Sequence, residues 1–242
     1  MKHLILYFFL SLPVFNAFSQ EKNNPIAASN ENDSIKVVDK KYREDQFYLS
    51  ITYNLLGNKP DDVNQSGFSS GFHLGYIRDM PINEKRNMAI GIGLGLSTNS
   101  YNQKLLITED NGGYNYELLN DDVSFSKNKF TTYILEVPIE FRWRTSTETD
   151  YDFWRIYGGL KIGYVVHNSS KFRGRPEDIK LSNIDDFNKL QYGLTLSAGY
   201  STVNFHFYYA LSNLFDSNAK VASTGQAVEM NAIKIGLIFY IL

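Results

Sequence analysis

The chain contains no cysteine, so disulfide bonds, thiol chemistry and anchoring through a lipidated N-terminal cysteine are all excluded. It also lacks any run of the roughly 18 to 20 apolar residues that a transmembrane helix needs. The net charge of −2 gives no basic excess, which argues against a nucleic-acid partner. What is present is a chain of 242 residues, 15% of them aromatic, with no shift in composition that would divide it into two globular domains.

The first residues have the features of a secretory signal peptide. Two basic or polar residues precede an apolar stretch over 4–15, and a small-x-small sequence, Ala-Phe-Ser, ends just before Gln20. We predict a signal peptide over 1–19 that is cleaved before Gln20; the alternative is a structural helix, which Pro13 would interrupt. The segment 20–44 is polar and has no sustained period, so we predict a flexible periplasmic segment.

The segment 133–144, YILEVPIEFRWR, is the most informative part of the chain. Every second residue from its first tyrosine is apolar, whereas Glu136, Glu140 and Arg142 lie in the opposite phase. Successive side chains of a strand point to opposite faces, so one face here is apolar and the other carries charge. A charge facing lipid near the bilayer midplane costs about 2–4 kcal/mol, so this phase is the one that a membrane-spanning strand requires.

The same alternation recurs along the chain and predicts eight strands of the length that crosses a bilayer. The long and short connections between these segments alternate without exception, beginning and ending with a long one. Outer-membrane barrels alternate short periplasmic turns with longer extracellular loops in this way. We therefore predict an all-β fold for 45–242: an eight-stranded antiparallel up-and-down transmembrane β-barrel. The predicted strands are 46–55, 68–78, 87–97, 133–144, 153–167, 190–200, 203–211 and 231–242; the long loops are 57–67, 98–129, 168–189 and 212–229, and the short turns are 79–86, 145–152 and 201–202.

A soluble eight-stranded barrel of the lipocalin type, or a secreted sandwich, is the competing fold. A soluble barrel would expose its charged face, but here the polar phase is dominated by small residues, which indicates a crowded interior. Trp143 and Trp154 flank the short turn 145–152 on the apolar face. We predict that both lie at the periplasmic membrane interface, where amphipathic aromatic residues collect; core tryptophans of a soluble sandwich are the alternative.

The polar phase also carries charged residues that would point into the lumen. An eight-stranded barrel has an interior just wide enough for its own side chains, so we exclude a general diffusion pore and expect buried charges to be paired. We predict a hydrogen-bonded ionic network that acts as a structural plug; a gate or a proton path is the alternative. The residues assigned to this network are Glu136, Glu140, Arg142, Arg155, Lys161, His206 and Lys234.

The sequence offers little for catalysis or for binding a metal or cofactor. His167, in the polar phase of 153–167, precedes an Asn-Ser-Ser sequence near the extracellular end, which leaves a lipid-modifying enzyme as a further alternative. The glycine-rich stretch 91–95 has no helix after it and is not a phosphate-binding loop. The acidic pieces 109–111 and 120–122 lack EF-hand spacing and are interpreted as solvated loops. We predict no catalytic, cofactor-binding or metal site.

Three stretches carry a resemblance to a known family: 133–147, YILEVPIEFRWRTST; 153–172, FWRIYGGLKIGYVVHNSSKF; and 208–215, YYALSNLF. The chain resembles the PorT-like outer-membrane β-barrel proteins of Bacteroidota over 46–242. The resemblance implies an integral outer-membrane protein without enzymatic activity, and it supplies no catalytic residues. PorT is linked to the type IX secretion system, which exports proteases, adhesins and gliding components.

From the pattern and the resemblance we expect a non-enzymatic outer-membrane barrel that assists protein secretion or outer-membrane assembly through protein contacts. The expected partners are outer-membrane lipids and subunits of secretion or barrel-assembly machinery, without nucleic acid or a cofactor. The alternative is a stand-alone surface barrel whose four long loops serve adhesion or envelope integrity.

Overall fold

The computed structural model describes residues 43–60, 63–110, 112–120, 123–146 and 153–241. The predicted signal peptide, 1–19, and all but the last two residues of the predicted periplasmic segment, 20–44, lie outside these ranges. No helix within them is long and apolar enough to cross a membrane.

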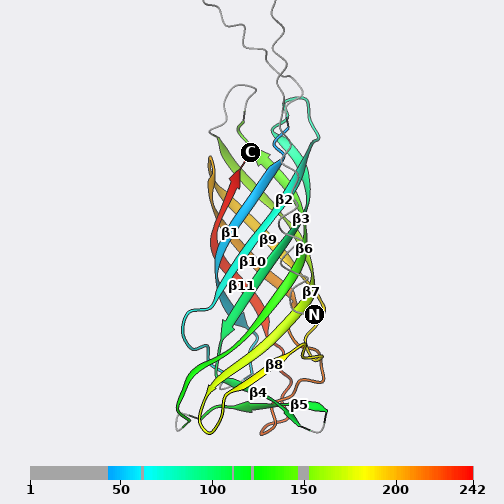
Figure 1. The fold of residues 1–242 in the computed structure, drawn as a ribbon. Coiled ribbons are helices and arrows are strands. Elements are labelled where there is room, and N and C mark those ends of the chain that lie inside the picture. Colours follow the sequence, from blue (N-terminus) through cyan, green and yellow to red (C-terminus); the bar gives the residue numbers. More distant parts are fainter. Residues whose placement is uncertain (1–42, 61–62, 111, 121–122, 147–152, 242) are drawn as a thin grey trace, which may run out of the picture. The chain divides into compact units, whose positions relative to one another are not determined.

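Eight antiparallel strands close into a barrel, which confirms the predicted fold class (Figure 1). The strands follow one another around the barrel in chain order, and the circle closes where β11 pairs with β1. β6 pairs with both β3 and β7, so the sheet has no free edge at that point. The barrel strands are β1 (Gln46–Gly57), β2 (Ser70–Pro81), β3 (Met88–Asn102), β6 (Phe125–Arg144), β7 (Trp154–Gly174), β9 (Leu190–Tyr200), β10 (Val203–Asn213) and β11 (Asn231–Ile241).

Alternation along each strand separates an apolar outer wall from a filled interior. In β9, for example, Leu194 and Leu196 are exposed, whereas Thr195 and Ser197 between them are buried. The same pattern in the other strands leaves a belt of exposed Leu, Ile, Val, Phe, Tyr and Trp side chains around the barrel. An exposed apolar surface of this extent requires an apolar surrounding, because in water it would cost far more than a folded domain can offset.

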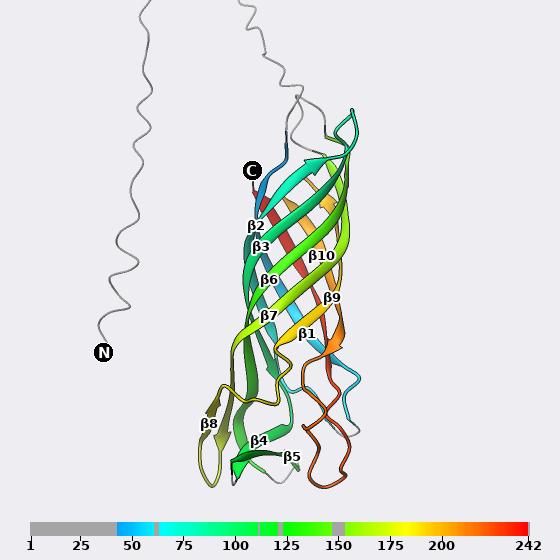
Figure 2. The same ribbon diagram turned by 90° about the vertical axis from the view of Figure 1, so that its right-hand side faces the viewer.

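Three further strands lie at one end of the barrel, in the long connections. β4 (Leu105–Asp110) and β5 (Gly113–Leu118) form a separate two-stranded sheet, and β8 (Ile179–Ser182) pairs with the last part of β7. Figures 1 and 2 show all three at the end opposite the C-terminus, beyond the tilted wall of the barrel. We call this the loop end and the opposite end, which carries the short connections, the turn end.

β9 has the predicted bounds, but β6 and β7 are longer than predicted at the loop end. β6 begins at Phe125 rather than at residue 133, and β7 continues to Gly174. The two extensions pair with each other, as in Lys129 opposite Lys171. Here the polarity of the two faces is reversed: Phe130 and Phe172 point inward and are buried, and lysines face outward. An alternation rule that expects apolar residues outside therefore misses these segments.

Two residues lie elsewhere than predicted. Asp79 was placed in the turn 79–86, but it belongs to β2, opposite Gly91, and is fully buried. His167 was placed in the inward phase, but Val166 is an extra residue in β7: Tyr133 pairs with His167 and Ile134 with Val165. A β-bulge of this kind shifts the phase by one residue, so His167 packs against the outward-facing Tyr133.

The four long connections, predicted as loops, pack together into a hydrophobic core at the loop end. We call this group of buried residues the loop-end cluster; it joins side chains of every long connection to inward-facing residues of the barrel mouth. Three of its aromatic rings, Phe130, Phe187 and Phe215, contact one another with centroids 4.3–5.5 Å apart. The cluster comprises Leu56, Val63, Tyr101, Leu105, Ile107, Tyr116, Phe130, Ile184, Phe187, Tyr208, Ala210, Leu214, Phe215, Ala219, Val221, Val228, Met230 and Ala232.

Candidate functional site: the filled lumen

The inward face of the strands buries charged residues, most of them in two groups. Among the described residues, five cations and four anions are buried in the barrel and at its ends, so the charge inside this part of the chain is nearly balanced. They are Arg142, Arg144, Arg155, Lys161 and Lys234, with Glu44, Asp79, Glu136 and Glu140.

Asp79 is the centre of the first group, the turn-end cluster, which also contains Glu44, Gln46, Glu140, Arg142, Arg144 and Arg155. The Asp79 carboxylate accepts a hydrogen bond from Arg142 Nη1 at 2.9 Å and two from Arg144, at 2.9 and 2.8 Å. Arg142 Nε also lies 3.3 Å from Glu140 Oε2. Because all these side chains are buried, the arginines depend on Asp79 and Glu140 for compensation of their charge.

The turn-end cluster also holds the chain just before β1. Arg142 donates from Nη1 to the Glu44 carbonyl oxygen at 3.2 Å and from Nη2 to Gln46 Oε1 at 2.6 Å. The backbone N–H of Asp79 donates to Asp45 Oδ1 at 2.7 Å. Glu44 and Asp45, the residues just before β1, are thus fixed to the barrel wall at the turn end.

Aromatic rings lie against two of the three guanidinium groups. Arg142 lies over the Tyr157 ring at 4.2 Å, and Arg155 lies over the Phe153 ring at 4.4 Å. Stacking of this kind suits the weakly hydrated guanidinium group. Among the described residues, Nε and Nη1 of Arg155 have no hydrogen-bond partner.

Glu136 is the centre of the second group, the central cluster, which also contains His73, Ser97 and Lys161. Glu136 lies 3.3 Å from Lys161 Nζ and 3.2 Å from His73 Nδ1, and it accepts a hydrogen bond from Ser97 Oγ at 2.7 Å. The partners come from β2, β3 and β7, so one carboxylate ties three strands to β6. This gives the lumen a fixed arrangement of charges at mid-height.

The predicted lumen residues all point inward and are buried, but they are not one continuous network. Glu136 meets Lys161, and Glu140 meets Arg142. The other three have different neighbours: Arg155 stacks on Phe153, His206 lies 2.9 Å from Ser197 Oγ, and Lys234 lies over the Tyr208 ring at 4.8 Å.

Sequence reasoning missed four charged or titratable members of these clusters: His73, Asp79, Arg144 and Glu44. The phase of the strands contained a signal for two of them. Arg144 continues the alternation of Glu140 and Arg142, and His73 lies between two inward-facing glycines of β2. Nothing in the sequence indicated that the chain before β1 would be part of the lumen contacts.

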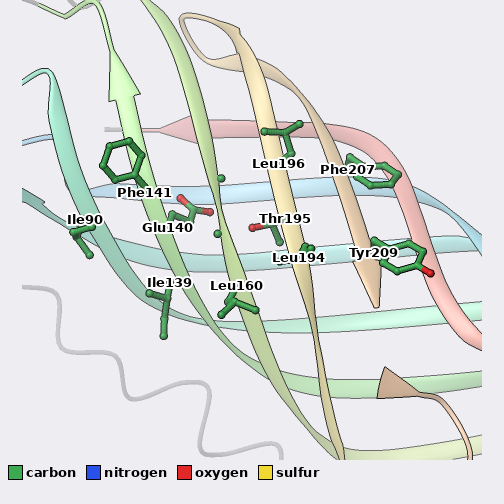
Figure 3. Close-up of a pocket in the computed structure, with 12 residues that line it drawn as sticks. Ile90, Ile139, Glu140, Phe141, Leu160, Leu194, Thr195, Leu196, Phe207 and Tyr209 are labelled. Carbon is green, nitrogen blue, oxygen red and sulfur yellow. The ribbon is translucent and has the colours of Figure 1, made fainter. Parts of the chain in front are cut away.

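The outer wall carries the two predicted interface aromatics and a shallow apolar groove. Trp143 and Trp154 face outward next to the connection 145–152, and Trp154 packs edge-on against Tyr200 at 5.4 Å. The groove lies over β6, β7 and β9, where the outward-facing Gly158 leaves a gap between larger residues (Figure 3). The groove is a part of the apolar belt, and the inward-facing Glu140 and Thr195 contribute only a small part of its lining. Its apolar lining residues are Ile90, Ile139, Phe141, Leu160, Leu194, Leu196, Phe207 and Tyr209.

A family model, described as an outer membrane protein beta-barrel domain, matches residues 18–216, which include most of the barrel. The chain belongs to this family. It is therefore an outer-membrane β-barrel protein: the belt faces lipid, the turn end with both ends of the barrel domain is periplasmic, and the loop end is extracellular.

No curated protein matches the chain. Among solved structures, the chain is similar to Ail, the attachment invasion locus protein of Yersinia pestis, with 16% identity and a TM-score of 0.37. The similarity covers 82% of this chain and 99% of the Ail chain. A TM-score this low carries no structural argument. The assignment of an eight-stranded barrel rests on the strand pairing of this chain alone.

The buried charges of the lumen can be compared with what a metal site or a catalytic group would need. Within the described residues no group of three or more His, Cys, Asp or Glu side chains is placed to hold a metal ion. Three of the four buried carboxylates, Asp79, Glu136 and Glu140, are paired with arginine, lysine or histidine side chains, and a carboxylate fixed in this way is a poor general base or nucleophile.

Proposed function

We propose that this protein is a non-conducting, non-enzymatic outer-membrane barrel that assists protein secretion, of the type IX kind, or outer-membrane assembly through protein contacts. The observation that supports it is the filling of the lumen: ionic clusters occupy its centre and turn end, and the loop-end cluster covers the other mouth. With the interior occupied, the surfaces left for function are the periplasmic and extracellular ends.

The periplasmic end supports a role in secretion or assembly. In the sequence the polar segment 20–44 immediately precedes β1, and its last residue, Glu44, is held by Arg142 while the next residue, Asp45, is held by Asp79. A polar segment that starts from such a fixed point suits contacts with periplasmic subunits of an export or assembly machine. The resemblance to PorT-like proteins, which are linked to type IX secretion, points in the same direction.

The proposal is tested by isolating the tagged full-length protein from native outer membranes in a gentle detergent and identifying what accompanies it. Secretion or barrel-assembly subunits should be recovered with the intact protein and lost when 22–40 is deleted. Deletion of the gene should reduce export of type IX cargo. Normal export, together with recovery of the barrel alone, would contradict the proposal.

A second candidate, a stand-alone surface barrel for adhesion or envelope integrity, is favoured by the loop-end cluster. Long loops that share a hydrophobic core present a pre-organised surface, which lowers the entropic cost of binding a partner. This candidate predicts normal export in the deletion strain with changed surface binding or detergent sensitivity.

Conductance separates both candidates from a channel. In planar bilayers the purified protein should show no stable open levels, because the buried side chains of the two ionic clusters and of the loop-end cluster occupy the lumen. Stable open levels would overturn the non-conducting assignment.

A further inference from the structure

The extracellular extensions of β6, β7 and β8 carry a row of lysines across three neighbouring strands. Lys129 of β6 lies directly opposite Lys171 of β7, which lies directly opposite Lys180 of β8. We call these three residues the lysine row. Lys127 and Arg173 form a second cationic pair one step farther from the barrel.

The lysine row lies on the same side of the sheet as the lipid-facing belt. The pairing of β3 with β6 keeps one register from Lys129 to Trp143, so the alternation along β6 is unbroken over that stretch. Lys129 is therefore in phase with the exposed Tyr133 and Leu135. In β7 the extra residue Val166 shifts the phase and brings Lys171 to the same side.

The height of the row matches the layer of lipid headgroups. Lys129 lies four residues beyond Tyr133, which is about 13 Å along a strand and about 10 Å along the membrane normal at the usual tilt. Thr131 and Ser169, which pair with each other, occupy the outer face between Tyr133 and Lys129. A lysine side chain is long enough to lie along this part of the outer face and place its ammonium group at the level of the lipid headgroups.

The row has a charge that the described structure leaves uncompensated. Like charges directly opposite on a sheet destabilise it. Burial, together with the neighbouring Lys127 and Lys171, lowers the pKa of Lys129. No described acidic residue lies within ion-pair distance of the three lysines; the nearest ion pair on this face joins Arg173 to Asp178 at 3.7 Å, between exposed side chains.

We propose that the lysine row binds the phosphate groups of glycolipid headgroups in the outer leaflet of the outer membrane. Continuity with the lipid-facing belt selects a lipid as the occupant, and the cationic charge selects an anionic one. Neighbouring strands are 4.7–4.9 Å apart, so the row presents three ammonium groups over about 10 Å, which suits more than one phosphate oxygen. This role is independent of the secretion proposal.

The test uses the full-length protein folded in detergent micelles and two probes: purified lipopolysaccharide, and the same lipopolysaccharide after removal of its phosphates. The triple variant K129Q/K171Q/K180Q is compared with K59Q/K85Q/K220Q, which removes the same charge from exposed lysines away from this face. Heat-modifiable gel mobility verifies that each protein is folded.

The wild type and the control variant should bind the phosphorylated probe about tenfold more tightly than the dephosphorylated one, the effect of three partly exposed ion pairs. The lysine-row variant should lose this preference while still binding the acyl part of both probes. Equal binding of both probes by the wild type, or an unchanged preference in the variant, would overturn the proposal. Tighter binding of heparin than of lipopolysaccharide would also overturn it, in favour of a soluble polyanion.

Discussion

Replacing Asp79 with asparagine removes the negative charge from between two buried arginines and leaves most of the shape in place. Asp79, Arg142 and Arg144 are fully buried, and three charge-assisted hydrogen bonds converge on the carboxylate. Removing one partner of a buried ion pair costs about 3–5 kcal/mol, because the remaining charge stays desolvated without compensation. Glu140 still faces Arg142, so Arg144 suffers most, and we expect a loss near the middle of that range, about 4 kcal/mol.

The free energy of unfolding is measured by urea titration of the barrel in lipid vesicles, followed by its heat-modifiable gel mobility. Asp178→Asn is the matched control: it removes the same charge from an exposed pair with Arg173, which contributes about 0–1 kcal/mol. If Asp79→Asn unfolds within about 1 kcal/mol of the wild type, the turn-end cluster does not stabilise the barrel in the way argued.

Three further predictions address the wall and the loop end. Gly159→Ala should destabilise the barrel by about 1–3 kcal/mol because its Cβ would overlap the Ile139 carbonyl oxygen, whereas Gly158→Ala, with its nearest atom 3.8 Å away, should be neutral in the same urea titration. Phe215→Ala should remove about 3–5 kcal/mol from the loop-end cluster, seen as faster protease cleavage of the loops with unchanged heat-modifiability of the barrel. Burial and the hydrogen bond to Asp186 raise the pKa of Tyr116. The stability that Tyr116 gives the loop end is therefore fully present below about pH 10, the pKa of an unfolded tyrosine, and is lost as the pH rises beyond that value. Tyr116→Phe should reduce the alkaline increase in the rate of loop cleavage, and an unchanged pH profile would contradict this.

The wall of the barrel was predictable because the membrane imposes one rule on every strand that crosses it. Each lipid-facing position must be apolar, so alternation alone locates β9 at its observed bounds and the other strands within a few residues in the belt. Beyond the belt the rule no longer applies. Phe130 and Lys129 follow the opposite rule, that of a soluble protein, and the extensions of β6 and β7 were therefore interpreted as loops.

The contents of the lumen were predictable as a set of residues but not as a set of contacts. The alternation of apolar and polar residues along a strand assigns Glu136 and Arg142 to the interior, but it does not say which residues they contact there. Which partner each meets depends on the register between strands far apart in sequence: Asp79 and Arg142 are separated by 63 positions. Asp79 itself was missed because the predicted second strand ended at residue 78, just before it, whereas β2 continues to Pro81.

The single extra residue Val166 connects the two environments of β7. Before it, odd-numbered residues such as Arg155 and Lys161 point into the lumen. Without the bulge, that phase would continue and would turn Lys171 inward and Phe172 outward. With it, Phe172 is buried and Lys171 joins the outward row. The bulge lies level with Tyr133, at the height where the outer face changes from apolar to cationic, so the change of phase along the strand coincides with the change of solvent around it.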